Sequence, residues 1–239
     1  MKNEHHSVTE KFPVFLRQQM NSLYFEEPVQ FEHTVPIINF IIPITGREEQ
    51  ARRFFDTVRS EVIENRKTVH LTLVYFESKK DSKTFQKVKD EFTALLEESS
   101  NVGNQLEGAI LTPDGTFSRG RGLQIGAESR PIGSLLFMVD IDMVFKTDLL
   151  TKIVENTKMG QAFMPIVLSQ YEEREKPEDN FYVSTDQGFW RSYGYGMIAI
   201  YKEDLLKSGG YDLNIKGWGM EDIELCDAII KECFSKKNF

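Results

Sequence analysis

A pair of carboxylates at the end of an apolar run has the clearest chemical meaning in this sequence. Asp140 and Asp142 directly follow the apolar segment 135–139 and are separated by Ile141. Side chains of a strand alternate with a period of two, so we expect both carboxylates to leave the end of a buried strand on the same side. At that spacing they could share one hard divalent cation, because such cations prefer oxygen ligands. The pair therefore predicts a site for a cation and a diphosphate.

Transfer of a sugar from a nucleoside diphosphate would require such a cation. The diphosphate leaves poorly unless its growing negative charge is neutralised, and Mn²⁺ or Mg²⁺ held by one or two carboxylates can act as the Lewis acid. We predict Asp142, expected nearer the crevice, as the metal ligand, with Asp140 beside it. The alternative is a solvated loop, since two acids after a strand often have no further role. The place of the pair after the fourth expected strand favours the metal site, because ligands bind at the carboxyl ends of parallel strands.

A second acidic pair follows a glycine-rich segment near the end of the sequence. Gly217 and Gly219 permit a close backbone turn, and Trp218 between them offers a flat apolar wall for a sugar. A hydroxyl that attacks an anomeric carbon needs a carboxylate base within hydrogen-bond reach. We therefore predict Asp222 as the base and Glu221 as a ligand of a sugar hydroxyl. The alternative is that both acids only complement the positive end of a helix dipole.

Arginines after two of the expected strands are candidates for binding phosphate. Arg47 directly follows the first strand, and the segment Phe117–Gly122 lies between a strand and a helix. Glycines there could admit a nucleotide, and the arginines could contact its phosphates or base. Two alternatives remain open, namely an ordinary turn at Arg47 and a Ser118 helix cap with solvated arginines.

The elements that must position these residues alternate between strands and helices. Apolar runs predict strands at Ile37–Ile42, Val69–Phe76, Leu106–Leu111, Leu135–Val139, Ala162–Leu168 and Met197–Tyr201. Helical spacing predicts helices at Glu48–Glu64, Ser82–Glu98, Arg119–Ala127, Lys202–Lys207 and Glu221–Cys233. Thr147 is expected to cap a further helix that runs to about Thr157. This βαβ order predicts an α/β fold with a mostly parallel central sheet covered by helices.

The composition limits the number of domains and the classes of partner. With 239 residues, of which 40% are hydrophobic, the chain fits one α/β domain at residues 36–239, preceded by a stem or linker at residues 1–35. A net charge of -8 argues against nucleic acid as a partner. Local arginines would then have to bind any anionic sugar nucleotide or uronic acid, and the candidates are Arg47, Arg119, Arg121 and Arg191. There is neither an apolar stretch near 20 residues nor a signal-peptide pattern after Met1.

Several motifs, taken in order, resemble those of chondroitin N-acetylgalactosaminyltransferases and the C-terminal domains of chondroitin synthases. They are Phe40–Arg47, Val69–Phe76, Phe117–Gly122, Asp140–Asp142, Ser169–Tyr171, Gly188–Arg191 and Gly217–Asp222. Their order makes a chance match a poor explanation. The family is similar in turn to the β-1,4-galactosyltransferases, whose GT-A fold agrees with the α/β prediction.

The resemblance implies an inverting transfer of GalNAc from UDP-GalNAc to a terminal glucuronic acid of a chondroitin acceptor, forming a β1,4 linkage with Mn²⁺ as the metal. It implies a Golgi type II membrane protein. The residues that match the family's nucleotide-contacting positions are Pro43, Arg47, Phe117 and Arg119. Those that match its metal motif are Asp140 and Asp142, and those that match its donor and acceptor wall with the base are Trp218, Glu221 and Asp222. Asp142 and Asp222 should then line opposite sides of one cleft.

The sequence departs from the family's pattern at three points. The family places a metal-binding His after the last helix, whereas no His follows His70 here, so we expect either a chain that lacks the family's C-terminal end or water in place of the missing ligand. The N-terminal anchor of a Golgi enzyme is also not visible, and Met220 stands where galactosyltransferases have Gly. The missing ligand leaves open an alternative function, that of a non-catalytic partner subunit of a chondroitin polymerase.

Overall fold

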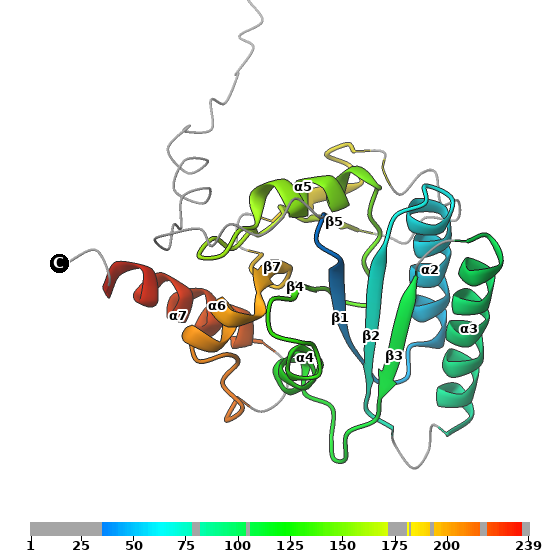
Figure 1. The fold of residues 1–239 in the computed structure, drawn as a ribbon, viewed down its shortest axis with the longest axis horizontal. Coiled ribbons are helices and arrows are strands. Elements are labelled where there is room, and N and C mark those ends of the chain that lie inside the picture. The colour runs from blue at the N-terminus through cyan, green and yellow to red at the C-terminus, as the bar shows by residue number, and fades with distance from the viewer. Residues whose placement is uncertain are drawn as a thin grey trace, which may run out of the picture.

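A five-stranded sheet forms the centre of the molecule in the computed structural model (Figure 1). The structure describes residues 35–77, 82–103, 106–171, 181, 183–191, 194–215 and 219–235. The strand order is β3-β2-β1-β4-β7, and all neighbours are parallel except β4 and β7. The strands are β1 (Ile38–Ile44), β2 (Val69–Tyr75), β3 (Glu107–Leu111), β4 (Leu135–Met138) and β7 (Ile198–Tyr201). The predicted mostly parallel α/β sheet is confirmed, whereas almost all of the predicted stem lies outside the described residues.

Helices cover both faces of this sheet. In Figure 1, α2 and α3 lie on one side of it, and α4, α6 and α7 lie on the other. The helices are α2 (Glu48–Val58), α3 (Ser82–Asn101), α4 (Arg119–Glu128), α5 (Asp148–Asn156), α6 (Lys202–Lys207) and α7 (Glu221–Ser235). A π-helical turn, η1 (Arg59–Ile63), continues α2. Within the described part of the chain, none of the helices has the length and apolar character needed to cross a bilayer.

The alternation of side chains along β1 explains why the sheet is covered on both faces. All its residues are buried. Phe40 and Ile42 belong to the core cluster on the side of α2 and α3, where the rings of Phe40 and Phe137 pack edge-to-face with centroids 5.2 Å apart. Ile41 belongs to the cluster on the opposite side, together with Leu123 of α4. A strand that is apolar on both faces must be covered twice, which is the reason for the three-layer arrangement.

The helix α4 lies unusually close to the sheet. A Cβ atom built on Gly126 would lie 2.3 Å from Cγ2 of Ile41, and one built on Gly122 would lie 2.7 Å from Cβ of Pro43. Real Cβ atoms do not approach other atoms this closely, so any larger residue at either position would force its neighbours to shift. The close approach brings the first residue of α4, Arg119, to the carboxyl end of the sheet.

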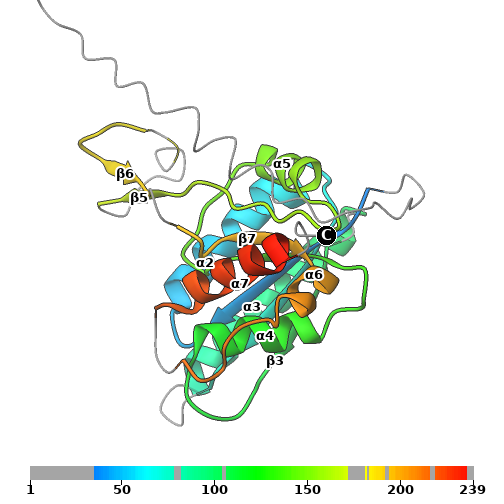
Figure 2. The same cartoon turned by 90° about the vertical axis from the view of Figure 1, so that its left-hand side faces the viewer.

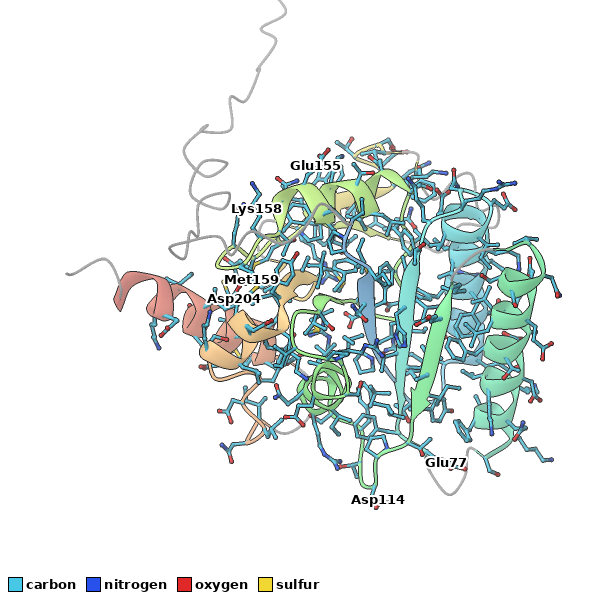
Figure 3. All side chains as sticks on the ribbon, in the orientation of Figure 1. Glu77, Asp114, Glu155, Lys158, Met159 and Asp204 are labelled. Carbon is cyan, nitrogen blue, oxygen red and sulfur yellow. The ribbon has the colours of Figure 1, made fainter. Side chains whose placement is uncertain are left out.

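The carboxyl ends of the parallel strands meet at one edge, where the order of the strands reverses. From β1 the chain proceeds outward to β2 and β3 and then returns to place β4 on the other side of β1. Glu77 follows β2 and Asp114 follows β3, and both lie along the lower edge of the molecule in Figure 3. The reversal between β1 and β4 opens a crevice at this edge, as in other doubly wound sheets.

Two sequence-based predictions in this region are wrong in detail. No continuous strand covers residues 162–168, because Phe163 forms only an isolated bridge with Ala199. Pro165 has no N–H to continue the ladder, and the next strand, β5 (Leu168–Gln170), pairs with β6 (Gly188–Trp190) in a separate hairpin. Thr147 does precede α5, but its hydroxyl donates to the backbone oxygen of Glu61 and does not cap the helix.

Candidate active site

A cleft of about 220 Å³ lies at the carboxyl end of β4 and beside the start of α7. It brings together charged side chains that are far apart in the sequence. Its lining includes Arg119, Asp140, Arg191, Glu221 and Asp222. The two predicted acidic clusters therefore share one cavity through Asp140, Glu221 and Asp222.

Arg119 joins the two acidic clusters. Its Nε donates to Oδ1 of Asp140 at 2.6 Å, and its Nη1 donates to Oε1 of Glu221 at 3.3 Å. Its Nη2 donates to the backbone oxygen of Gly196 at 2.6 Å. All three nitrogens thus have protein acceptors, and the residue is only 4% exposed. Arg119 is therefore buried and links the turn after β4 to the first turn of α7.

The local structure around α4 separates two neighbouring arginines. Ser118 is the N-cap of α4 and accepts a hydrogen bond from the backbone N–H of Arg121, so the predicted cap is correct. The alternative that both arginines are solvated is wrong for Arg119, which is buried. Arg121 instead donates to the backbone oxygen of Asp114 and lies over the ring of Phe76.

The cleft carries more negative than positive charge. Burial raises the pKa of Asp140, the neighbouring charges of Asp142 and Glu221 raise it further, and Arg119 opposes this shift. Burial would lower the pKa of Arg119, but Asp140 and Glu221 more than offset burial, and its pKa is raised. Oε2 of Glu221 is buried, and none of the described residues forms a hydrogen bond with it. Because buried polar atoms normally have a partner, this oxygen favours the binding of a hydrogen-bond donor or a cation beside it.

Asp142 lies apart from the other acids. It is not among the residues that line the cleft, and its Oδ2 accepts from Nη1 of Arg47 at 3.2 Å, where both side chains are about half exposed. β4 ends at Met138, and the backbone turns at Asp140, whose oxygen accepts from the N–H of Met143. The period-two argument therefore does not apply to this pair. Asp140, and not Asp142, lines the cleft together with Asp222, so the structure brings a different acid to Asp222 than we expected.

The start of α7 places its two acids differently. Glu221 is buried against Arg119, whereas Asp222 is partly exposed and accepts from the N–H of Ile223 with Oδ1. Oδ2 of Asp222 would lie 3.7 Å from a Cβ atom built on Gly196, so the two lie next to each other. Met220, just before the helix, has a φ of 74°, a left-handed conformation that is unfavourable for a side chain of this kind. The turn into α7 therefore holds some strain beside the cleft.

The other predicted site residues lie around the same edge or outside the described residues. Pro43 is buried in β1 beside Gly122, and the ring of Phe117 packs edge-on against Phe76 with centroids 5.5 Å apart. Neither lines the cleft. Trp218 lies outside the described residues. Sequence reasoning missed the backbone oxygen of Gly196 as an acceptor for Arg119, and no pattern in the sequence signals it.

The chemistry of the acids fits a hard divalent cation better than any other metal. The candidate ligands are carboxylate oxygens, which suit Mg²⁺ or Mn²⁺. Within the described residues, no group of three or more His, Cys, Asp or Glu side chains is arranged to hold a metal ion. Cations of this kind are often held by one or two carboxylates plus substrate phosphates. Of the expected pair only Asp140 lines the cleft, and Asp142 would join it as a ligand once its salt bridge with Arg47 opened.

The fold is that of the GT-A glycosyltransferases. A mannosyltransferase from Pyrobaculum calidifontis, solved in complex with GDP-Man and Mn²⁺, has a TM-score of 0.53 over 90% of this chain and 58% of its own, at 10% sequence identity. TarS from S. aureus has a TM-score of 0.50 over 81% of this chain and 55% of its own, at 12% identity. At these identities the likeness concerns the fold alone.

The chain belongs to the chondroitin N-acetylgalactosaminyltransferase family, whose model matches residues 2–236. Human chondroitin sulfate N-acetylgalactosaminyltransferase 2 is 33% identical over 91% of this chain and 41% of its own length. Mouse chondroitin sulfate synthase 3 is 32% identical over 83% of this chain and 23% of its own length. The predicted family is thus confirmed, and the chain spans well under half the length of these relatives.

Proposed function

We propose that this chain transfers GalNAc from UDP-GalNAc to a terminal glucuronic acid of a chondroitin acceptor, with inversion to a β1,4 linkage. The observation that carries the proposal is the shared cleft, in which Asp140, Glu221 and Asp222 meet at the carboxyl edge of a GT-A sheet. Membership of the family supports the donor and the acceptor class. We further propose the Golgi lumen as its location and a chondroitin synthase subunit as a candidate partner.

Asp222 is our choice for the base, because its carboxylate is partly exposed in the cleft while Glu221 is buried. Its carboxylate would take the proton of the acceptor hydroxyl as that oxygen forms a bond to the anomeric carbon. The bond from this carbon to the diphosphate oxygen breaks, and UDP leaves with the electron pair. Attack opposite the leaving group inverts the anomeric carbon.

Asp140 and Asp142 would hold the divalent cation, for which we choose Mn²⁺, and bound there it supplies Lewis-acid neutralisation of the leaving diphosphate. Arg47 lies beside Asp142 and could meet the phosphates once its salt bridge opens. Pro43 and Phe117 remain proposed contacts of the nucleotide, and Trp218 remains a proposed wall for the sugar. Arg119 acts by holding Asp140 and Glu221, because its nitrogens already have protein acceptors.

The test is release of UDP from UDP-GalNAc in the presence of Mn²⁺ and a glucuronate-ended chondroitin oligosaccharide. Asp142→Ala should weaken donor and metal binding, seen as a raised KM for UDP-GalNAc. Asp222→Asn should lower kcat by a factor of about 10² to 10⁴ while UDP affinity stays nearly unchanged, as expected for loss of a base. Exposed Asp148→Asn on α5 is a control that should change neither quantity.

Two outcomes would count against the proposal. Unchanged turnover in both Asp142→Ala and Asp222→Asn would remove these residues from the mechanism. Titration of UDP by calorimetry with and without Mn²⁺ provides the second check. Metal-independent or absent UDP binding by the unaltered chain would favour the partner-subunit function over the enzyme.

A further inference from the structure

The wall of the cleft continues outward along the hairpin formed by β5 and β6. Figure 2 shows this hairpin projecting from the body of the molecule on the side where α7 begins. Val167, directly before β5, and Arg191, directly after β6, both line the cleft. The N–H of Arg191 donates to the oxygen of Val167 at 2.9 Å, which extends the hairpin ladder up to the cleft.

The register of the hairpin decides which side chains share the face that begins at the cleft. Ser169 pairs with Phe189, and beyond this pair the N–H of Tyr171 donates to the oxygen of Gln187 at 3.1 Å. Because side chains alternate along each strand, Phe189 lies on the same face as Arg191. Trp190 pairs with Leu168 and lies on the opposite face.

Contacts between side chains agree with this register. Nε of Arg191 donates to Oγ of Ser169 at 2.6 Å, and the rings of Phe189 and Tyr171 lie with centroids 6.0 Å apart. Phe189 and Tyr171 are 52% and 60% exposed. One face of the hairpin therefore runs from a cationic side chain at the cleft, past a hydroxyl, to a pair of exposed aromatic rings. We call the residues Ser169, Tyr171, Phe189 and Arg191 the hairpin platform.

Exposed aromatic rings beside the proposed sugar-transfer cleft are suited to bind a glycan. The apolar C–H faces of pyranose rings pack on aromatic faces, and the guanidinium of an arginine pairs with a carboxylate. A glycan that contains uronic acid offers both features in turn. The overall charge of -8 opposes such an anionic ligand, so its binding depends on a placed cation such as Arg191.

We propose that the hairpin platform binds the acceptor glycan behind its terminal sugar, with Arg191 pairing with a uronate carboxylate and Phe189 and Tyr171 packing on the sugars that follow. This inference rests on the proposed function, and it makes the chain selective for long acceptors. The continuity of the platform with the cleft wall carries it. A short acceptor would reach the cleft without covering the rings.

The test compares binding of glucuronate-ended chondroitin disaccharide and hexasaccharide by calorimetry, without donor. The unaltered chain should bind the hexasaccharide more tightly. Phe189→Ala and Tyr171→Ala should each weaken hexasaccharide binding about five- to tenfold, the usual cost of truncating an aromatic contact, and leave disaccharide binding unchanged. Trp190→Ala removes an equally exposed ring from the opposite face of the same strand and should preserve the preference for length.

Several outcomes would overturn the platform. Equal affinity for both lengths in the unaltered chain would do so, as would an equal loss in Trp190→Ala and Phe189→Ala. Sedimentation of the same variants provides an independent check, because a change in oligomeric state on Phe189→Ala without a change in glycan binding would assign the face to a second copy of the chain. If hexasaccharide binding depended on Phe189 and Tyr171 but the chain released no UDP, the proposed transfer would be refuted and the hairpin platform would still be supported.

Discussion

At the scale of single residues, Arg119 determines the arrangement of the candidate site. It is buried at the start of α4 and holds Asp140, which follows β4, and Glu221, the first residue of α7. Two buried carboxylates repel each other, and the guanidinium of Arg119, which pairs with both, offsets this repulsion. The arginine's planar fork can meet several acceptors at once, which a lysine ammonium cannot do with the same geometry.

Replacement of Arg119 should therefore be costly. Arg119→Met leaves Asp140 and Glu221 without their cation, and we expect it to lower the free energy of unfolding by about 3 to 5 kcal/mol. Denaturant unfolding measures this. Arg121→Met is the matched control on the same helix, because Arg121 is only partly buried and bonds a backbone oxygen, and it should cost less than about 1 kcal/mol. A similar loss of unfolding free energy in both variants would contradict the proposal that Arg119 stabilises the fold by linking Asp140 to Glu221.

At the scale of elements, the close packing of α4 against β1 and β2 places the site. Glycines on one face of α4 let the helix approach the strands. The first turn of α4 then reaches the reversal point between β1 and β4, where the cleft opens. A larger side chain on this face would push the helix outward and move Arg119 away from Asp140.

Gly126→Ala tests this packing. Alanine favours the helix by about 1 kcal/mol over glycine, but its Cβ would meet Cγ2 of Ile41 at 2.3 Å. We expect the steric overlap to outweigh the gain in helix propensity, so that the variant loses about 1 to 3 kcal/mol of stability in denaturant unfolding.

The matched variant for this test is Ile41→Ala, which removes the methyl group that the new Cβ would meet. It is destabilising by itself, because Ile41 is fully buried. The double variant should be less destabilised than the sum of the two single variants by more than about 0.5 kcal/mol. Strictly additive losses would show that the overlap is not the cause.

At the scale of the whole molecule, the two ends of the sheet have different tasks. The carboxyl end holds the cleft, whereas the opposite end holds a buried polar network around His70. There Nη1 of Arg130 lies 2.9 Å from Nε2 of His70, and Nε of Arg130 donates to Asn39. Burial and the charge of Arg130 lower the pKa of His70 to about 4, and Glu107 partly opposes this shift.

This network makes the stability of the fold depend on pH. In the unfolded chain His70 binds a proton near its ordinary pKa of about 6.5, whereas in the folded chain its pKa is lowered to about 4. Stability from neutral His70 is therefore complete above about pH 6.5 and is lost as the pH falls toward 4, with a slope of at most about 1.4 kcal/mol per pH unit.

Thermal or denaturant unfolding between pH 7 and pH 4 measures this effect. His70→Gln removes the titrating group, so its stability should depend less steeply on pH than that of the unaltered chain over the same interval. Both proteins share all other titrating groups, which cancel in the comparison. Parallel curves for the two proteins would mean that His70 titrates alike in the folded and unfolded states.

Much of the architecture follows from local patterns. The apolar runs of β1 and β2 and the helix of Lys202–Lys207 are read from composition and periodicity alone, because burial on both faces leaves an unbroken apolar strand. The strand expected at residues 162–168 failed at Pro165, where a missing N–H outweighs an apolar pattern. The hairpin of β5 and β6 was not predicted, since its strands are only three residues long and mostly incompletely buried.

The sequence by itself determined the α/β class, the family and the acids that could do chemistry, because these depend on residue type and on spacing within one segment. Only the tertiary structure decided which acids share a cavity. It directs Asp140 into the cleft and Asp142 toward Arg47, and it engages all three nitrogens of Arg119 with protein acceptors. These contacts depend on how α4 and α7 pack where the strand order reverses. They join residues up to about a hundred positions apart, and no local sequence pattern predicts such contacts.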